Sequence, residues 1–237
     1  MPSIAQEVES TPEQVIGAAL DRFNQDRVAI SFSGAEDVVL IDMASKRVGT
    51  SFNVFTLDTG RLHAETYEFI DRVRDHYGIQ IDVLSPDNWE VEELVREKGL
   101  FSFYRDGHTQ CCGIRKIASL ERKLGDLDAW ITGQRRDQGA TRTSVPHEQI
   151  DTAFSTRNHE IVKFNPLASW ESKDVWSYIH EHQVPYNVLH DRGYKSIGCA
   201  PCTRPIADGE PERAGRWWWE QEDDKECGLH AQNLSRD

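Results

Sequence analysis

The chain has 237 residues, 38% of them hydrophobic, and a domain of this size can bury an ample core without disulfides. Its formal net charge of −13 argues against nucleic-acid binding and against binding to an anionic membrane surface, because both need a basic face. No apolar run approaches the roughly 18 residues that cross a bilayer, and the polar, acidic N-terminal segment lacks the pattern of a secretory signal. We therefore expect a cytoplasmic protein, and the sequence leaves its oligomeric state open, a homo-oligomer included.

Strand and helix patterns alternate over the first two-thirds of the chain. Strands separated by helices form βαβ units, so the expected fold class is α/β, a parallel sheet flanked by helices. Such sheets bind their ligands beyond the carboxyl ends of the strands. The predicted strands are Arg27–Phe32, Phe52–Leu57, Ile79–Leu84 and Ala129–Gly133, and the predicted helices are Glu36–Arg47, His63–His76, Trp89–Lys98 and Gln110–Leu124.

Three of the predicted strand ends carry residues suited to an anionic ligand. The first strand leads into Ser33 and Gly34, whose small side chains let backbone N–H groups at a helix N-terminus approach an anion. The second strand ends at Asp58, and the fourth is followed by Arg135 and Arg136. Each segment alone also fits an ordinary turn or cap, but together they favour a nucleotide or another phosphorylated ligand. The dinucleotide fingerprint and the Walker A motif are both absent.

The pattern changes after about residue 154. We predict a strand at Glu160–Leu167 and a helix at Ser172–Glu181, followed by a loop-like, polar stretch. Arg213 and Arg216 are spaced to share one face of a helix, and Trp217–Trp219 follow directly. Three consecutive tryptophans cannot share one buried helix face, so we expect at least one to meet a ligand, a partner or solvent. Packing of a C-terminal helix onto the sheet is the alternative reading.

The five cysteines fall into a set of four and one left over. Cys111 and Cys112 are adjacent, Cys199 and Cys202 form C-x-x-C, and Cys227 stands alone. Four thiolates complete one cluster or metal shell and leave the fifth free to react. Two disulfides are the weaker alternative, because cytosolic thiols rarely pair. Zinc usually draws on C-x2-4-C knuckles, and adjacent side chains diverge, so the spacing favours a [4Fe–4S] cluster while leaving zinc open.

Cys227 lies in a polar stretch, residues 220–237, that has no core pattern and is typical of a disordered tail. The acidic residues around it should raise its pKa, and Lys225 and His230 should oppose that effect. A mobile thiol that visits a substrate and then a reductant suits a two-stage covalent mechanism. An incidental surface cysteine is the alternative.

On these motifs the chain resembles the assimilatory sulfonucleotide reductases, specifically the adenosine 5′-phosphosulfate (APS) reductases of bacteria. The resemblance covers nearly the whole chain and implies one domain over residues 1–237, with an α/β core to about 202 and a C-terminal segment with a catalytic tail beyond it. It implies the PP-loop sheet of the adenine nucleotide α-hydrolases. The matching motifs are SGAEDV (33–38), LDTG (57–60), CCGIRK (111–116), GQRRDQ (133–138), GCAPCT (198–203) and ECGLH (226–230).

The resemblance implies that Cys227 attacks the sulfur of APS, AMP leaves, and reduced thioredoxin releases sulfite from the S-sulfocysteine. Lys116, Arg213 and Arg216 would contact the phosphosulfate, with His108 and His230 as candidates for the same pocket. The residues implied to hold the nucleotide are Ser33, Gly34, Asp58, Arg135 and Arg136, and those implied to ligate one [4Fe–4S] cluster, which positions Lys116, are Cys111, Cys112, Cys199 and Cys202.

Differences from neighbouring families narrow the choice of function. ATP pyrophosphatases of this fold carry SGGxDS, whereas residues 33–38 read SGAEDV, which disfavours an iron–sulfur tRNA thiolation enzyme. Reductases of the 3′-phosphorylated substrate, PAPS, usually lack the two cysteine pairs, so the motifs favour APS. Some cluster-bearing members accept both substrates, which leaves dual specificity open. A non-catalytic iron–sulfur sensor would not need the ECGLH tail.

Overall fold

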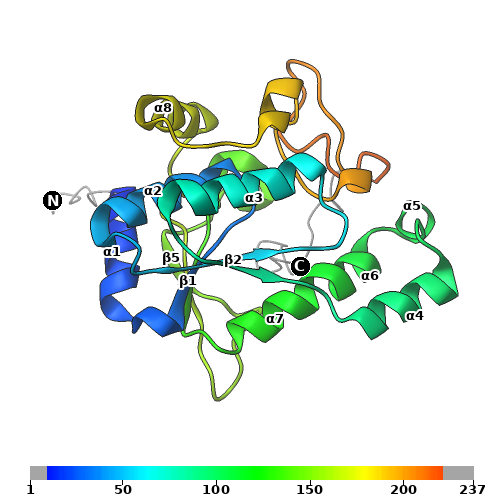
Figure 1. Cartoon of the computed structure of the whole chain (residues 1–237), viewed down its shortest axis with the longest axis horizontal. Coiled ribbons are helices and arrows are strands. Elements are labelled where there is room, and N and C mark those ends of the chain that lie inside the picture. The colour runs from blue at the N-terminus through cyan, green and yellow to red at the C-terminus, as the bar shows by residue number, and fades with distance from the viewer. Residues whose placement is uncertain (1–9, 221–237) are drawn as a thin grey trace, which may run out of the picture.

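Short, buried hydrophobic runs form the central sheet in the computed structural model, which describes residues 10–220 (Figure 1). β1 and β4, at its centre, are buried along nearly their whole length, as expected for a sheet covered on both faces. The strands are β1 Val28–Ser31, β2 Asn53–Leu57, β3 Ile81–Leu84, β4 Ala129–Ile131, β5 Glu148–Ile150 and β6 Val162–Phe164.

The strand order is β3-β2-β1-β4-β6-β5. All neighbours pair in parallel except the edge strand β5, which runs antiparallel to β6. This topology confirms the predicted α/β class with a mainly parallel sheet. The chain proceeds outward from β1 to β3 and then returns to the other side of β1 with β4. The crevice beyond the carboxyl ends of β1 and β4 is therefore the place where this kind of sheet binds a ligand.

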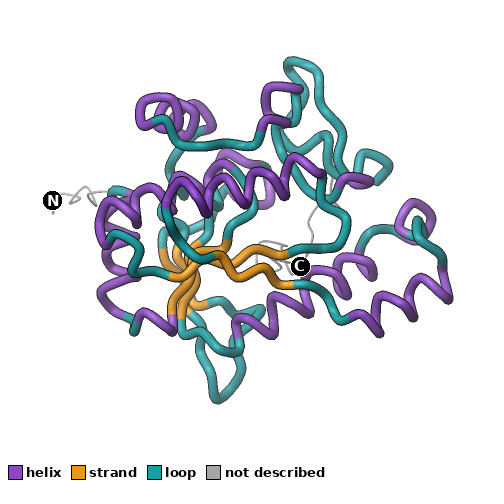
Figure 2. Tube along the Cα trace, viewed as in Figure 1, coloured by secondary structure: helices purple, strands orange, loops and turns teal. Residues whose placement is uncertain are grey.

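Helices cover both faces of the sheet, as the purple and orange segments of Figure 2 show. α2 and α3 pack on one face together with α1 and α8, and α7 packs on the other. None of the helices within residues 10–220 combines the length and apolar character needed to cross a bilayer. The helices are α1 Pro12–Arg22, α2 Ala35–Val48, α3 Ala64–Tyr77, α4 Asn88–Lys98, α5 Phe103–Asp106, α6 Thr109–Cys112, α7 Ala118–Leu124 and α8 Ser172–His182.

Three of the α-helices and strands, α1, α5 and β5, were not predicted from the sequence. α1 begins with a capping box in which Thr11 and Gln14 bond to each other's backbone N–H groups, and Pro12 occupies its first turn. α5 has only four residues, too few to show a helical period, and β5 is a three-residue edge strand without a clear alternating pattern.

The predicted helix Gln110–Leu124 is interrupted in its middle. Gly113–Ile117 form a turn of π-helix between α6 and α7. The Arg115 guanidinium in this turn donates to the Thr59 carbonyl at 2.7 Å. A π turn inserts one extra residue into the helical repeat and so changes which way its side chains point. Here that turn carries both Arg115 and Lys116, which are buried.

The prediction of a helix around Arg213–Trp219 is wrong, because the segment consists of turns. Gly215 packs so closely on the Arg204 carbonyl that a Cβ would lie 2.3 Å from that oxygen. Trp217 has a φ of 40°, outside the helical region. The expectation that at least one tryptophan meets a ligand, a partner or solvent is confirmed, since Trp218 is 40% exposed, whereas Trp217 is 1% exposed.

Candidate active site

A cavity of about 180 Å³ opens at the carboxyl ends of β1, β2 and β4. Its wall includes the loop after β1, the first turn of α2, the loop after β4 and the segment from Lys195 to Arg216. The structure thus brings together strand ends and a C-terminal segment that are far apart in the sequence. The predicted substrate-binding residues in this wall are Ser33, Gly34, Lys116, Arg213 and Arg216.

The loop after β1 is held by Asp37 of α2. One carboxylate oxygen of Asp37 accepts from the backbone N–H groups of Ser33 (2.7 Å) and Gly34 (3.0 Å), and the other accepts from Gly133 N–H at 3.0 Å. These two loop N–H groups, which the sequence suggested for an anion, therefore already have an acceptor. Burial and the neighbouring Glu36 raise the pKa of Asp37 to about 6. A Cβ on Gly133 would lie 2.5 Å from the Glu36 Cβ, so only glycine permits this approach.

Asp58 and Arg136 lie outside the wall of the cavity. The Asp58 carboxylate accepts from the Gly60 N–H at 2.8 Å and from the Tyr67 hydroxyl at 2.7 Å, so it fixes the turn in which it sits. Arg136 donates to the Val145 carbonyl at 2.8 Å. The structure gives both side chains protein partners outside the cavity wall, and their contact with a nucleotide stays a prediction.

Arg135 is also absent from the cavity wall, although it is only 1% exposed. Its guanidinium pairs with Glu36 and Glu212 at 2.9 Å and with Asp137 at 3.0 Å. Burial raises the pKa of Glu212, and the Arg135 charge opposes that effect. Glu36 and Glu212 both line the cavity, whereas Arg135 does not. The Arg135 guanidinium therefore neutralises two carboxylates of the cavity wall without itself lining the cavity.

All four cysteines of the predicted cluster line a second, smaller pocket. Cys111 and Cys112 come from α6, Cys199 precedes the 3₁₀ turn Ala200–Cys202, and Cys202 ends that turn. None of the four forms a disulfide. No three His, Cys, Asp or Glu side chains within residues 10–220 are arranged to hold a single metal ion. The sulfurs therefore share a pocket without converging on one ion-sized point.

The walls of this cysteine pocket are cationic and rich in N–H donors. Arg61, Arg115, Lys116 and Arg216 line it together with the cysteines and Trp217. Four buried N–H donors on residues of this pocket find no acceptor in the described part of the chain: Arg61 Nη1, Arg115 Nε, Arg216 Nε and Trp217 Nε1. Four thiols beside unsatisfied donors and positive charge fit an anionic iron–sulfur cluster, whose sulfurs accept hydrogen bonds.

The cations act unequally on the thiols. Burial opposes ionisation of Cys199, but Lys116, the Thr59 hydroxyl and Arg216 outweigh it and lower the pKa of that thiol. Thr59 Oγ1 lies 3.2 Å from Cys199 Sγ. Burial instead raises the pKa of Cys202 to about 12, with the Cys199 charge adding to the effect. Ionising the whole set would therefore need a bound cation or metal centre.

The two pockets share a wall made of Lys116 and Arg216. These side chains are 8% and 6% exposed. Only glycine at position 198 leaves room for the Arg216 side chain, because a Cβ on Gly198 would lie 2.5 Å from the Arg216 guanidinium. The positive charges that face the larger cavity are thus the same ones that face the cysteines.

His108 belongs to the cysteine pocket and is absent from the wall of the larger cavity. Its ring stacks on Trp217 with the centroids 4.1 Å apart. Its backbone N–H donates to Glu220 Oε1 at 2.8 Å, and its ring nitrogen Nδ1 pairs with the other oxygen. Cys227 and His230 lie outside the described residues.

Comparison with known proteins identifies the family. The phosphoadenosine phosphosulfate reductase domain matches residues 27–205. The chain belongs to the phosphoadenosine phosphosulfate (PAPS) reductase family. It is 59% identical to an adenosine 5′-phosphosulfate reductase of Pseudomonas aeruginosa over 99% of this chain and 88% of that protein. It is 47% identical to one of Burkholderia cepacia, over 89% of this chain and 83% of that protein. The predicted sulfonucleotide reductase family is confirmed.

Solved structures agree on the fold. The phosphate complex of PAPS reductase from Candida auris matches with a TM-score of 0.67 at 27% identity, over 86% of this chain and 99% of that one. Yeast FAD synthetase matches with a TM-score of 0.53 at 14% identity, over 82% of this chain and 66% of that one, a likeness of fold alone. The predicted PP-loop architecture is confirmed.

The cavity wall also contains residues that were not among the predicted site residues, among them Gln134, Arg142 and His190. Gln134 is 2% exposed, and its amide oxygen and nitrogen find no hydrogen-bond partner within residues 10–220. In the same part of the chain neither ring nitrogen of His190 has one, and burial lowers the pKa of His190. Gln134 belongs to the GQRRDQ motif (133–138), which was a signal for it, whereas His190 lies outside the matched motifs, eight residues before GCAPCT (198–203).

Proposed function

We propose that this protein reduces APS to sulfite and AMP in assimilatory sulfate reduction, with thioredoxin as the electron donor. One observation carries the proposal: Lys116 and Arg216 form the common wall of a cavity at the strand ends and of a pocket lined by four cysteines. The relatives from Pseudomonas aeruginosa and Burkholderia cepacia are adenosine 5′-phosphosulfate reductases, which supports it. We place the reaction in the cytoplasm, where thiols are kept reduced.

The cationic wall suits the reacting end of the substrate. APS joins a sulfuryl group to the α-phosphate of AMP, and negative charge grows on that phosphate as the bond between them breaks. Lys116, Arg213 and Arg216 line the cavity, and preorganised positive groups stabilise such charge most where water is excluded. These side chains would bind the phosphosulfate and favour the departure of AMP.

Cys227 supplies the nucleophile in this proposal. Its thiolate attacks the sulfur of APS, a sulfur–sulfur bond forms, the sulfur–oxygen bond breaks, and AMP leaves with the electron pair. A thioredoxin thiolate then attacks Cys227 Sγ and releases sulfite, which leaves a mixed disulfide. The second thioredoxin thiol resolves that disulfide, so thioredoxin is oxidised and Cys227 returns as a thiol.

We propose that Cys111, Cys112, Cys199 and Cys202 hold one [4Fe–4S] cluster. The all-thiol ligand set and the unsatisfied N–H donors around the pocket support it. When bound, the cluster supplies a fixed negative charge that positions Lys116 and tunes the local potential. No electron of the reaction passes through it, because the thiols of thioredoxin carry both.

We propose a preference for APS over PAPS of at least about tenfold in kcat/KM, roughly 1.4 kcal/mol. The motifs suggest no dedicated pocket for a 3′-phosphate, and the cysteine pairs are a feature of APS-using members. Dual use of APS and PAPS is the second candidate. An iron–sulfur tRNA thiolation enzyme is disfavoured by the net charge of −13.

The test uses anaerobically purified full-length protein and the variant Cys227→Ser. Wild type given APS without thioredoxin should gain about 80 Da on Cys227, the mass of one SO₃ group, and reduced thioredoxin should remove it as sulfite. The variant should keep about four irons per chain and bind APS, yet release no sulfite, since a serine hydroxyl cannot be cleared by thiol exchange.

The same preparations decide between the alternatives. An adduct on another cysteine, or turnover by Cys227→Ser, would refute the covalent mechanism. Stoichiometric zinc without sulfide would refute the cluster. Equal kcat/KM for APS and PAPS would establish dual specificity.

A further inference from the structure

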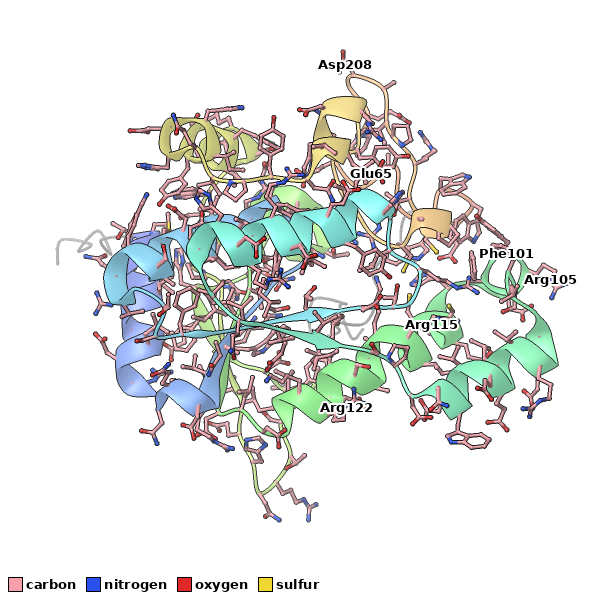
Figure 3. The ribbon with its side chains drawn as sticks, in the orientation of Figure 1. Glu65, Phe101, Arg105, Arg115, Arg122 and Asp208 are labelled. Carbon is pink, nitrogen blue, oxygen red and sulfur yellow. The ribbon has the colours of Figure 1, made fainter. Side chains whose placement is uncertain are left out.

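A contiguous group of exposed apolar side chains lies beside the cysteine pocket. Leu100, Phe101, Tyr104 and Trp218 are 56%, 58%, 41% and 40% exposed, and we call them the aromatic patch. The rings of Phe101 and Tyr104 stack with centroids 6.2 Å apart, and Tyr104 and Trp218 are also 6.2 Å apart. Figure 3 shows Phe101 and Arg105 at the end of the molecule opposite α1. The patch thus joins the α4–α5 connection to the C-terminal turn.

The aromatic patch is held in place from beneath. Trp219 packs against Tyr104 and Phe103, with centroids 4.5 and 5.8 Å apart, and its Nε1 donates to the Phe103 carbonyl at 3.2 Å. The Tyr104 hydroxyl donates to the carbonyl of Pro201, between the cysteines of the C-x-x-C pair. Rigid, exposed aromatic rings are the side chains that contribute most to protein–protein binding, because they lose little conformational entropy.

The patch also adjoins the point from which the chain continues to Cys227. Trp218 is two residues before Glu220, and the Glu220 carboxylate is fixed by His108 through its backbone N–H and its ring. Cys227 follows Glu220 by seven residues, and a chain of that length reaches at most about 25 Å. A macromolecule that reacts with Cys227 therefore has to bind within reach of this segment, close to the aromatic patch.

We propose that the aromatic patch is the docking surface for the protein dithiol that discharges the sulfated Cys227. This inference rests on the proposed function, which requires such a reductant at every turnover. Docking raises the effective concentration of the attacking thiolate at the cysteine. The reductant must also leave each time, and small interfaces are typical of transient redox complexes. A patch of a few exposed rings suits that need better than a large apolar face.

The test separates the two half-reactions in the double variant Phe101→Ser/Trp218→Ser. Both side chains are at least 40% exposed and lie outside the buried cluster that the cysteines form with Phe103 and Trp217. The covalent adduct is formed with APS, isolated, and discharged either by reduced thioredoxin or by dithiothreitol, which needs no docking surface. Thioredoxin-dependent discharge should fall at least about tenfold in kcat/KM, as expected for the loss of interface anchors. Adduct formation and discharge by dithiothreitol should stay at wild-type rates.

Trp89→Ser is the matched control, because Trp89 is 71% exposed and lies at the opposite end of α4 from Leu100. It should behave as wild type in every assay. Unchanged discharge by thioredoxin in the double variant would overturn the proposal. Slower adduct formation would assign the patch to the substrate half-reaction, and a change in sedimentation with normal discharge would assign it to self-association. A wild-type protein that forms no adduct would refute the proposed function and this inference with it.

Discussion

At the scale of single residues, Lys116, like Arg216, faces both the strand-end cavity and the four cysteines. Lys116→Ala should lower kcat/KM for APS by roughly a hundredfold to a thousandfold, the usual cost of removing one preorganised group that stabilises developing charge. Iron content should be unchanged, because the lysine is not a ligand. Steady-state sulfite release and iron analysis measure the two effects.

Lys123→Ala provides the control for that substitution. Lys123 lies on the following helix, α7, and pairs with the exposed Asp82 at 2.6 Å. Its loss should leave sulfite release unchanged. A Lys116→Ala protein with normal kcat/KM, or one that lost its iron, would contradict the role given to Lys116.

Sequence motifs can group residues that share a pocket, but they do not reveal which partner a side chain meets. The spacing of Cys111, Cys112, Cys199 and Cys202 indicated one set, and all four line one pocket. An arginine after a strand does not reveal its partner. Arg135 donates to Glu36 and Glu212, which lie 99 and 77 residues away along the chain. Only the folded structure shows that these carboxylates pair with its guanidinium.

At the scale of secondary-structure elements, Arg135 joins the loop after β4 to α2 and to the loop that carries Arg213 and Arg216. Arg135→Met should reduce the free energy of unfolding by about 3–5 kcal/mol, because it leaves buried carboxylates without a counter-charge. It should also raise the KM for APS, since Glu36 and Glu212 line the cavity and would then repel the substrate. Urea denaturation and steady-state kinetics measure these changes.

The control removes an arginine from an exposed ion pair. Arg74 pairs with Asp71 at 3.0 Å and with Asp75 at 3.1 Å on the surface of α3. Arg74→Met should change the free energy of unfolding by no more than about 1 kcal/mol. If Arg135→Met were equally mild and left KM unaltered, the ion pairs of Arg135 would not be what holds these segments together.

Most elements followed from local pattern, and the exceptions follow from tertiary contacts. The predicted strands and helices of the first two-thirds are present, with ends shifted by a few residues. The helical period continues through residues 113–117, so nothing in the sequence indicates the π turn. In the structure, Arg115 of this turn donates a hydrogen bond to the Thr59 carbonyl. The spacing of Arg213 and Arg216 resembles a helix face, but Gly215 O accepts from the Arg204 N–H at 3.0 Å and Arg216 forms a β-bridge with Thr203, so this backbone pairs with another segment instead of coiling.

At the scale of the whole molecule, charge and packing are both unevenly distributed. The chain carries a formal net charge of −13, yet Lys116, Arg142, Arg213 and Arg216 gather round one cavity. These cations and Lys195 outnumber the carboxylates of Glu36, Asp37 and Glu212 in the same wall, and a low-dielectric cleft of net positive charge attracts a small anion even to an acidic protein. The hydrophobic core is likewise divided. The sheet packs within two large clusters, whereas the cysteines form a separate small one with Phe103 and Trp217.

This division predicts how the protein responds to loss of the proposed iron–sulfur cluster. The cysteine cluster buries few apolar side chains, so without metal it should open locally at a lower free energy than the sheet. After chelation under mild conditions, amide hydrogen exchange should accelerate in residues 101–112 and 198–219 and stay slow in β1 and β4. The iron-loaded protein is the reference. Equal acceleration in the sheet would mean that metal binding and folding of the whole domain form one cooperative unit, and that the boundary between the clusters has no energetic meaning.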